Sequence, residues 1–342
     1  MLNPITDEGL SFDDVLIIPH FSNITSRSEI TLLQKTSLDT VLDIPIISAN
    51  MDTITGEDML DAMDSFGGMG ILHRYMSVKD MEMAVDRWRV SGYGKIAISV
   101  GCLAKDKDRI NSLIQKFDKD EIIICIDIAH GHSKNMKDTL YYIRKDQRFE
   151  GSIIAGNVCT PQATRDLLHW GADMIKVGVG PGSACTTRLK TGCGFPQFTT
   201  IQKCSTVGPI IADGGIRSPG DAAKALAAGA ELVMVGGMLA GTDRTPQWNE
   251  NEPFVEFRGM ASKAARTSYE GVSKNAEGIS CTVEAKPVGS TEAVINELVE
   301  GIKSSMSYAG VDNLADFRKK TTFVKTTSAI INENRPHILE VV

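Results

Sequence analysis

A glycine-rich stretch near the middle of the chain, VGVGPGSACTTRLKTGCGFPQ over residues 177–197, carries a cysteine in surroundings that suit nucleophilic chemistry. Cys185 follows glycines, a proline and a serine, and it precedes two threonines and Arg188. A thiolate in such a loop is nucleophilic near neutral pH when its pKa is lowered or a neighbouring base removes the proton. A buried cysteine more often serves only as packing, and we expect that role for the other six cysteines. We therefore predict that Cys185 is a nucleophile, with inert packing as the alternative.

Two glycine pairs, in ADGG (212–215) and VGGM (235–238), each follow an apolar stretch. Glycine lets backbone N–H groups approach a ligand closely, so such pairs favour a phosphate site. A carboxylate beside them accepts hydrogen bonds from ribose hydroxyls, and a nearby serine adds a hydroxyl for the phosphate. The alternative is that the glycines only turn the chain. The predicted site consists of Ser183, Asp213, Gly214, Gly215, Gly236 and Gly237.

Eight short apolar stretches, rich in Ile and Val, alternate with segments of helical length. Such stretches are typical of parallel strands that are buried on both faces. Thr160-Pro161 and Ser218-Pro219 each combine a helix cap with a proline at the first helical position. The alternation predicts an α/β fold, a (β/α)8 TIM barrel, with a doubly wound sheet as the alternative. The predicted strands are 44–51, 68–75, 95–101, 121–128, 152–158, 174–179, 209–215 and 232–239.

Two segments lie outside this alternation, and we expect them to close the two ends of one barrel domain over residues 1–342. Residues 1–43 precede the first strand and are expected to form a capping strand or hairpin. Residues 243–290 are polar and rich in Gly and Ser, which is typical of a lid or flap at the carboxyl ends of the strands. We expect the last helix over 291–309.

Polar residues follow most of the predicted strands, at the end of a barrel where active sites lie. For any single residue, a role as a helix cap is an equally good interpretation. Their recurrence favours a shared site. Besides the cysteine loop and the glycine pairs, they are Asn50, Met51, Asp52, Arg74, Asp127 and Asn157.

Composition excludes several kinds of partner. The formal net charge is −7 and the chain has no dense basic run, so nucleic acid is not expected. No apolar stretch has membrane-spanning length, and the polar N-terminus does not resemble a signal peptide. Seven cysteines without a CxxC pair are typical of the cytoplasm. His130 and His132, in AHGHS, lack a third ligand and are weak evidence for a metal.

The motifs GVGPGSACTTR, IIADGGIRSPGD, VMVGGMLAGT and FRGM together resemble the IMP dehydrogenase/GMP reductase family, and the resemblance runs from LSFDDVLIIP to about residue 326. It implies a (β/α)8 barrel, typically a homotetramer, that acts on purine nucleotides through a covalent cysteine adduct at purine C2. Many dehydrogenases of the family carry CBS modules after the second strand. Here HRYMS and KIAISVG are joined by one predicted helix, so we expect no CBS insertion.

The resemblance favours the reductase branch. A dehydrogenase of the family hydrolyses its adduct with an adjacent Arg-Tyr pair on a mobile flap, whereas Arg266 and Tyr269 here are separated by two residues. SANMDT, LKTGCGFPQ, SSMSYAG and KKTTFVK look like GMP reductases; FRGM and the tail TTSAIINENRPH are similar to dehydrogenases. The alternatives are an IMP dehydrogenase with a shortened flap and a catalytically idle barrel that binds purine nucleotide.

For GMP, the resemblance implies a phosphate site at Ser183 and the glycine pairs and a ribose site at Asp213. Thr187 and Glu277 match the proton-relay positions beside Cys185. After the amine leaves C2, NADPH would deliver hydride there and IMP would be released. Ala261 and Lys274 replace a more usual Ser or Gly and an Arg. The residues implied to meet the base or close over it are Gly259, Met260, Ala261, Lys274 and Gly278.

The resemblance also implies a cofactor site and a potassium site. Arg74 stands where reductases often have lysine, and an arginine that pairs with a 2′-phosphate fits NADPH; NADH is the alternative. The cofactor-contact positions are Asp127, Ile128, Ala129, Val179 and Gly180, with Ser26 and Arg27 reaching the cofactor of a neighbouring subunit. The positions that match the potassium site are Gly180, Gly182, Cys185 and Arg188.

Overall fold

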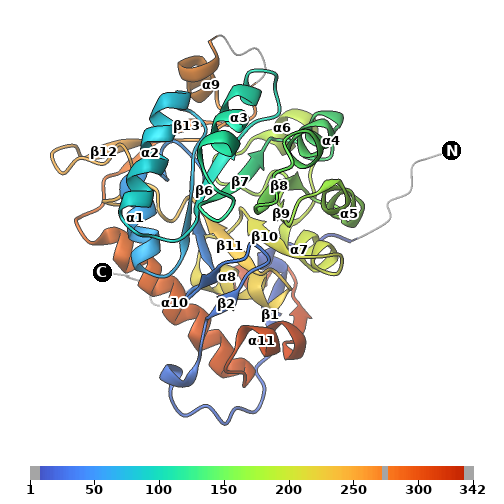
Figure 1. The fold of residues 1–342 in the computed structure, drawn as a ribbon. Coiled ribbons are helices and arrows are strands. Elements are labelled where there is room, and N and C mark those ends of the chain that lie inside the picture. Colours follow the sequence, from blue (N-terminus) through green and yellow to red (C-terminus); the bar gives the residue numbers. More distant parts are fainter. Residues whose placement is uncertain (1–7, 272–275, 335–342) are drawn as a thin grey trace.

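Eight parallel strands close into a barrel that is surrounded by helices (Figure 1). The computed structural model describes residues 8–271 and 276–334. Each barrel strand pairs with the barrel strands before and after it in the sequence, and β11 pairs with β4. The predicted barrel is confirmed, and the doubly wound sheet is wrong because this sheet has no open edge. The strands are β4 (Ile46–Ser48), β5 (Met69–Leu72), β6 (Ile96–Val100), β7 (Ile122–Asp127), β8 (Ile153–Val158), β9 (Met174–Val177), β10 (Ile210–Asp213) and β11 (Leu232–Val235).

Alternation along each strand divides the apolar side chains between two cores. In β7, Ile123 and Cys125 belong to the core inside the barrel, whereas Ile122, Ile124 and Ile126 belong to the layer between strands and helices. All five side chains are fully buried. Because both faces are covered, the strands read as continuous apolar stretches rather than as an alternating pattern.

Helices link the strands and begin where the capping residues indicate. The hydroxyls of Thr160 and Ser218 each accept a hydrogen bond from a backbone N–H in the first turn, and a proline follows each cap. The connection between β5 and β6 is the single helix α2. The helices are α1 (Glu57–Ser65), α2 (Val78–Val90), α3 (Asp106–Lys116), α4 (Lys134–Tyr141) with the π-helical turn η3 (Tyr142–Asp146), α5 (Pro161–Trp170), α7 (Gln197–Ser205), α8 (Pro219–Ala227) and α10 (Ser290–Ala309).

A hairpin closes the N-terminal end of the barrel, as the sequence predicts. It consists of β2 (Gln34–Lys35) and β3 (Val41–Leu42). Between them, Leu38 is fully buried in the core inside the barrel. Its carbonyl oxygen accepts a hydrogen bond from Oγ of Ser152, at 2.7 Å, just before β8. The amino ends of the strands are therefore covered, and the carboxyl ends face the site.

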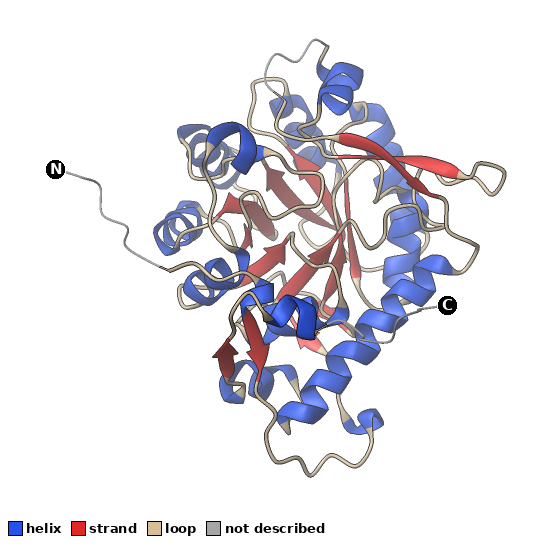
Figure 2. Cartoon of the chain, turned by 180° about the vertical axis from the view of Figure 1, so that it is seen from behind, coloured by secondary structure: helices blue, strands red, loops and turns tan. Residues whose placement is uncertain are grey.

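The segment after β11 forms a folded lid, which we define as residues 243–290. Two antiparallel strands, β12 (Phe254–Arg258) and β13 (Ser280–Glu284), flank α9 (Lys263–Glu270). In Figure 2 these strands lie beyond the barrel, at the opposite end of the molecule from the small β1–β14 sheet. The sequence predicted the lid but not its strands.

The remaining elements are short and lie at the chain's two ends or in the cysteine loop. Among the described residues, every helix is too short or too polar to cross a membrane. These elements are η1 (Phe12–Asp14), β1 (Val15–Ile17) paired with β14 (Phe323–Lys325), η2 (Arg27–Glu29), α6 (Thr187–Thr191), α11 (Leu314–Lys320) and α12 (Ile330–Glu333).

Gly301 provides a test of how tightly α10 packs on the barrel. A Cβ atom at Gly301 would lie 2.2 Å from Cβ of Pro219, whose rigid ring begins α8. We expect Gly301→Ala to lower the free energy of unfolding by about 1–3 kcal/mol, because overpacking outweighs the better helix propensity of alanine. Urea denaturation measures the change. Gly220→Ala is the matched control, since the nearest atom to a Cβ there is 3.7 Å away; an equal loss in both variants would contradict the prediction.

Candidate active site

A cavity of about 780 Å³ opens at the carboxyl ends of the strands. Loops after six of the eight barrel strands, Asn157 within β8 and the inner side of the lid line it. The predicted residues that line this cavity are Arg74, Asp127, Ile128, Ala129, Val179, Gly180, Gly182, Ser183, Cys185, Thr187, Asp213, Gly214, Gly215, Gly236, Gly237, Gly259, Met260, Ala261, Glu277 and Gly278.

Four predicted residues do not line the cavity: Ser26, Arg27, Arg188 and Asp52, of which Asp52 instead pairs with Arg258. Ser26 and Arg27 are at the start of η2, which contacts α10 rather than the cavity. The Arg188 side chain donates to two backbone carbonyls of its own loop, at 3.2 and 2.7 Å, and thereby braces that loop. Lys274 lies outside the described residues.

Cys185 begins a short series of hydrogen bonds. Its Sγ atom donates to Oγ1 of Thr187 at 3.3 Å, and that hydroxyl donates to Oε2 of Glu277 at 2.9 Å. The cysteine is partly buried at the cavity wall. A proton can therefore pass between the sulfur and a carboxylate through one hydroxyl, which is the arrangement that nucleophilic catalysis by a thiol needs.

The backbone of the lid pairs with the backbone of the cysteine loop. The N–H of Ile279 donates to the carbonyl of Ala184 at 2.9 Å, and the N–H of Thr186 donates to the carbonyl of Glu277 at 3.0 Å. A Cβ atom at Gly278 would lie 3.2 Å from the carbonyl oxygen of Ala184 in the cysteine loop and 3.0 Å from the backbone nitrogen of Ser262 in the lid, so only glycine fits this approach without movement. This pairing brings Glu277 beside Thr187.

The two glycine pairs serve different purposes. Gly214 and Gly215 have φ values of +93° and +83°, so they turn the chain in a region that L side chains rarely adopt. Gly237 instead lies close to Ser183: a Cβ atom there would be 2.8 Å from the serine Oγ. The second pair thus leaves space beside a hydroxyl, as an anion site requires, whereas the first pair also fits the alternative of a simple turn.

Two hydrogen-bond donors, whose residues also line the cavity, hold the Asp213 carboxylate in place. Its Oδ2 atom accepts hydrogen bonds from Nδ2 of Asn157 at 2.7 Å and from Nζ of Lys176 at 2.8 Å. Lys176 lies on β9 and is nearly fully buried. Sequence analysis missed this lysine, although a lone cation within the apolar MIKVGV was the available signal.

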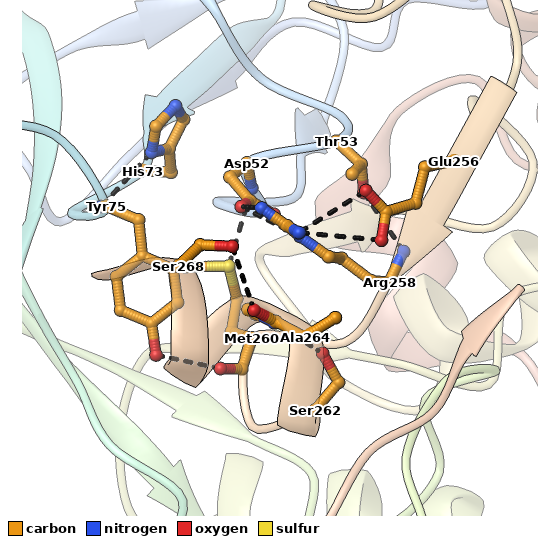
Figure 3. Close-up of polar contacts among 11 residues, drawn as sticks. Asp52, Thr53, His73, Tyr75, Glu256, Arg258, Met260, Ser262, Ala264 and Ser268 are labelled. Atoms are coloured by element: carbon orange, nitrogen blue, oxygen red, sulfur yellow. Dashed lines mark hydrogen bonds and ion pairs between the residues drawn. The ribbon is translucent and has the colours of Figure 1, made fainter. Parts of the chain in front are cut away.

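A buried ion pair joins the lid to the loop after β4 (Figure 3). Nη2 of Arg258, at the end of β12, lies 2.6 Å from Oδ2 of Asp52, and both side chains are buried. The backbone N–H of Asp52 contacts Sδ of Met260 at 3.4 Å, and the Tyr75 hydroxyl donates to the carbonyl of Met260 at 2.8 Å. Two barrel loops therefore fix the position of Met260 at the cavity wall.

Two contacts of Tyr75 extend this connection. Its ring stacks on the ring of Tyr269 in α9, with centroids 4.7 Å apart. Its backbone N–H donates to Nδ1 of His73 at 3.2 Å, which requires the unprotonated nitrogen. Burial lowers the pKa of His73 to about 4, so this acceptor persists at neutral pH. Arg74 lies over the Tyr75 ring at 4.9 Å and borders the cavity.

The other cysteines follow the packing prediction only in part. Cys125 and Cys204 are buried, and burial raises the pKa of the Cys204 thiol to about 11, which keeps it unreactive. Cys193 and Cys281 are exposed, so the expectation of buried packing is wrong for them. His132 pairs with Asp166 at 2.8 Å, and the described residues contain no group of three His, Cys, Asp or Glu side chains placed to hold a metal.

Comparison with known proteins identifies the family. Residues 9–337 match the family model described as IMP dehydrogenase / GMP reductase domain. The chain belongs to this family. Both names in that description denote oxidoreductases.

Members of both branches of the IMP dehydrogenase/GMP reductase family are similar to this chain. Inosine-5′-monophosphate dehydrogenase of Cryptosporidium parvum is 34% identical, over 98% of this chain and 96% of that protein. GMP reductase 2 of Homo sapiens is 35% identical, over 95% of this chain and 96% of that protein. A solved variant of GMP reductase from Trypanosoma brucei, in complex with guanosine 5′-monophosphate, has a TM-score of 0.89 at 27% identity, covering 98% of this chain and 99% of that chain. The branch must therefore be argued from the site.

In this family member, the Asp52–Arg258 pair gives a stability prediction. Arg258→Met leaves the Asp52 carboxylate buried without its cation, and we expect a loss of about 3–5 kcal/mol in the free energy of unfolding. Urea denaturation measures it. Arg87→Met is the control, because the Arg87–Glu57 pair is about half exposed (52% and 47%) and should contribute far less. Equal losses in the two variants would show that burial of the pair is irrelevant.

Proposed function

We propose that the protein is a GMP reductase, which converts GMP to IMP and ammonia with NADPH as the reductant. The observation that carries the proposal is the series from Cys185 through Thr187 to Glu277, with spacings of 3.3 and 2.9 Å. Reductive deamination needs a nucleophile for purine C2 and an acid for the departing amine. This series supplies both at one wall of the cavity.

GMP binding is supported by the groups that line the cavity. The phosphate lies against Ser183 and the glycine pairs, where the backbone leaves space beside a hydroxyl. The ribose hydroxyls donate to Asp213, which Asn157 and Lys176 hold in place. The base meets Gly259, Met260, Ala261 and Gly278, with Lys274 as a further contact.

The reaction begins when the Cys185 thiol passes its proton through Thr187 to Glu277. The thiolate Sγ then forms a bond to C2 of GMP, while the electron pair of the C2–N3 double bond moves to N3 and returns as the amine leaves. The C2–amine bond then breaks, and the amine takes a proton through Thr187 from Glu277 so that it leaves as ammonia rather than as an amide anion. Hydride addition at C2 follows. The Sγ–C2 bond breaks last, which returns the thiolate and releases IMP.

NADPH supplies that hydride when bound, and the residues at the far end of the cavity fit it. Asp127 offers a carboxylate for a ribose hydroxyl, and Arg74, beside the Tyr75 ring, offers a guanidinium for a 2′-phosphate. Ile128, Ala129, Val179 and Gly180 form the adjoining wall.

The finer parts of the proposal rest on the resemblance. One barrel domain over residues 1–342, without a CBS insertion, assembles as a cytoplasmic homotetramer, in which Ser26 and Arg27 reach a neighbouring subunit's cofactor. Carbonyl groups of Gly180, Gly182 and Cys185, in the loop braced by Arg188, bind potassium.

IMP dehydrogenase is the second candidate, and one observation favours it. Arg266 in the lid lines the cavity, where a dehydrogenase would need a cation beside its hydrolytic water. Tyr269, however, stacks on Tyr75, and it is not adjacent to Arg266 in the sequence. The pair that hydrolysis requires is therefore incomplete, which supports the reductase.

One pair of assays tests the function. Purified protein is mixed with GMP and NADPH, and separately with IMP and NAD⁺, while the absorbance of the reduced cofactor is followed. We expect NADPH consumption in the first mixture and no change in the second. Formation of reduced cofactor only in the second mixture would establish the dehydrogenase. No absorbance change in either mixture, with nucleotide still bound to the protein, would favour the catalytically idle barrel. Cys185→Ala should abolish turnover but keep GMP binding; turnover in that variant would contradict the covalent mechanism.

The role of Glu277 gives a second prediction. Glu277→Gln should lower kcat for GMP by about 10²–10⁴-fold, because the amine loses its acid. A nucleotide with chloride at C2 should be affected much less, since chloride leaves without a proton. Stopped-flow absorbance on both substrates measures the difference. Glu256→Gln, on β12 of the same lid, is the matched control and should retain kcat. An equal loss on both substrates would show that Glu277 is not the acid.

A further inference from the structure

Lys176 is the one part of the candidate site that belongs to both of its halves. Its side chain, on β9, is only 2% exposed, and Nζ lies 2.8 Å from Oδ1 of Asp127 and 2.8 Å from Oδ2 of Asp213. Asp127 ends β7 and belongs to the proposed cofactor half, whereas Asp213 ends β10 and belongs to the proposed ribose site. One ammonium therefore contacts a carboxylate from each half.

The amides beside Lys176 hold each carboxylate separately. Asn50 donates from Nδ2 to Oδ2 of Asp127 at 2.9 Å, and its Oδ1 atom lies 3.2 Å from Nζ of the lysine. Asn157 donates from Nδ2 to Oδ2 of Asp213 at 2.7 Å. Each amide thus serves one carboxylate, and only the lysine serves both.

The charges in this group depend on one another. Burial alone would lower the pKa of Lys176, but the two carboxylates raise it above its ordinary value, so the lysine remains an ammonium. Burial likewise opposes ionisation of Asp127, yet the ammonium holds the pKa of that carboxyl below its usual range. Without the lysine, burial of Asp127 would no longer be offset by the ammonium, and that carboxyl would take up a proton more readily.

We propose that Lys176 is a positioning residue that holds the substrate carboxylate and the cofactor carboxylate in place together, so that the affinities for both ligands depend on it. The inference rests on the proposed function, because it assigns one carboxylate to each ligand. Lys176 takes no part in bond making. Its effect passes through the orientation and charge of Asp127 and Asp213.

The test measures the binding of each ligand separately by isothermal titration calorimetry, so that turnover does not contribute. Lys176→Met, which removes the charge but keeps most of the volume, should raise the Kd for GMP and the Kd for NADPH by about tenfold or more each. Lys176→Arg, which restores a cation, should recover most of both affinities. Asp213→Asn and Asp127→Asn are the matched controls, and each should weaken mainly one ligand.

The pH dependence separates positioning from a general structural defect. In Lys176→Met, the buried Asp127 carboxyl loses the ammonium that lowers its pKa, so it takes up a proton more readily as the pH falls. The ratio of the variant's Kd for NADPH to the wild-type Kd should therefore rise as the pH falls from 8 to 6. Taking this ratio cancels the titration of the ligand's phosphate, which affects both proteins alike. A loosened fold would give a ratio that stays constant with pH.

Several results would overturn the proposal: a change in the Kd of only one ligand, no recovery with arginine, or a constant ratio. If Lys176→Met does not fold, the Kd for GMP is measured in Asp127→Asn and in the double variant Asp127→Asn/Lys176→Met. The same Kd in these two variants would also overturn the proposal. If the wild-type protein binds IMP and NAD⁺ instead, the same measurements are made with that pair. Failure of the reductase proposal is then seen in the wild-type protein, and failure of the Lys176 proposal is seen in the variants. Wild type that binds neither pair would contradict both.

Discussion

The pairing of β11 with β4 is the constraint on which the site depends. In an open sheet with strands about 4.8 Å apart, β7 and β10 would lie about 14 Å from each other. Closure curves the sheet, so that Asp127 and Asp213 both lie 2.8 Å from one nitrogen atom on β9. The same closure leaves no edge that needs protection and brings the loops after six strands to one cavity. The geometry of the site is thus a consequence of the barrel.

The lid is joined to the cysteine loop through the backbone as well as through side chains. Thr186 and Glu277 are paired by an N–H to carbonyl bond of 3.0 Å, and Gly278 makes the close approach that this pairing needs. The position of Glu277 relative to Cys185 is therefore fixed by backbone register. Substitutions at neighbouring lid positions, such as Ala261 in place of the more usual Ser or Gly, leave that register unchanged. This explains how the relay coexists with departures elsewhere in the motif.

The sequence predicts this fold well for strands that are buried on both faces. It predicts the fold poorly for strands that are buried on one face or exposed on both. All eight barrel strands were predicted because both faces are apolar, whereas β13 is almost wholly exposed and has no apolar pattern to detect. Cys185 and the glycine pairs were predicted from residue type and spacing. Lys176 was missed because its partners lie on other strands, and a lone lysine in an apolar stretch shows no partner in the sequence. The exposure of Cys193 and Cys281 was likewise set by tertiary packing.

The chemistry that divides the two branches of the family lies in the fate of the cysteine adduct. A carboxylate that reaches sulfur through Thr187 can protonate a departing amine or take a proton from water, so the relay alone serves either reaction. Hydrolysis also needs a base that activates the water, and the lid tyrosine that would assist Arg266 is stacked on Tyr75 instead. Hydride addition needs no such base, because the reductant brings its own electron pair. The preference for a reductase over a dehydrogenase therefore rests on the lid, where Tyr269 stacks on Tyr75 and is not adjacent to Arg266 in the sequence, rather than on the relay.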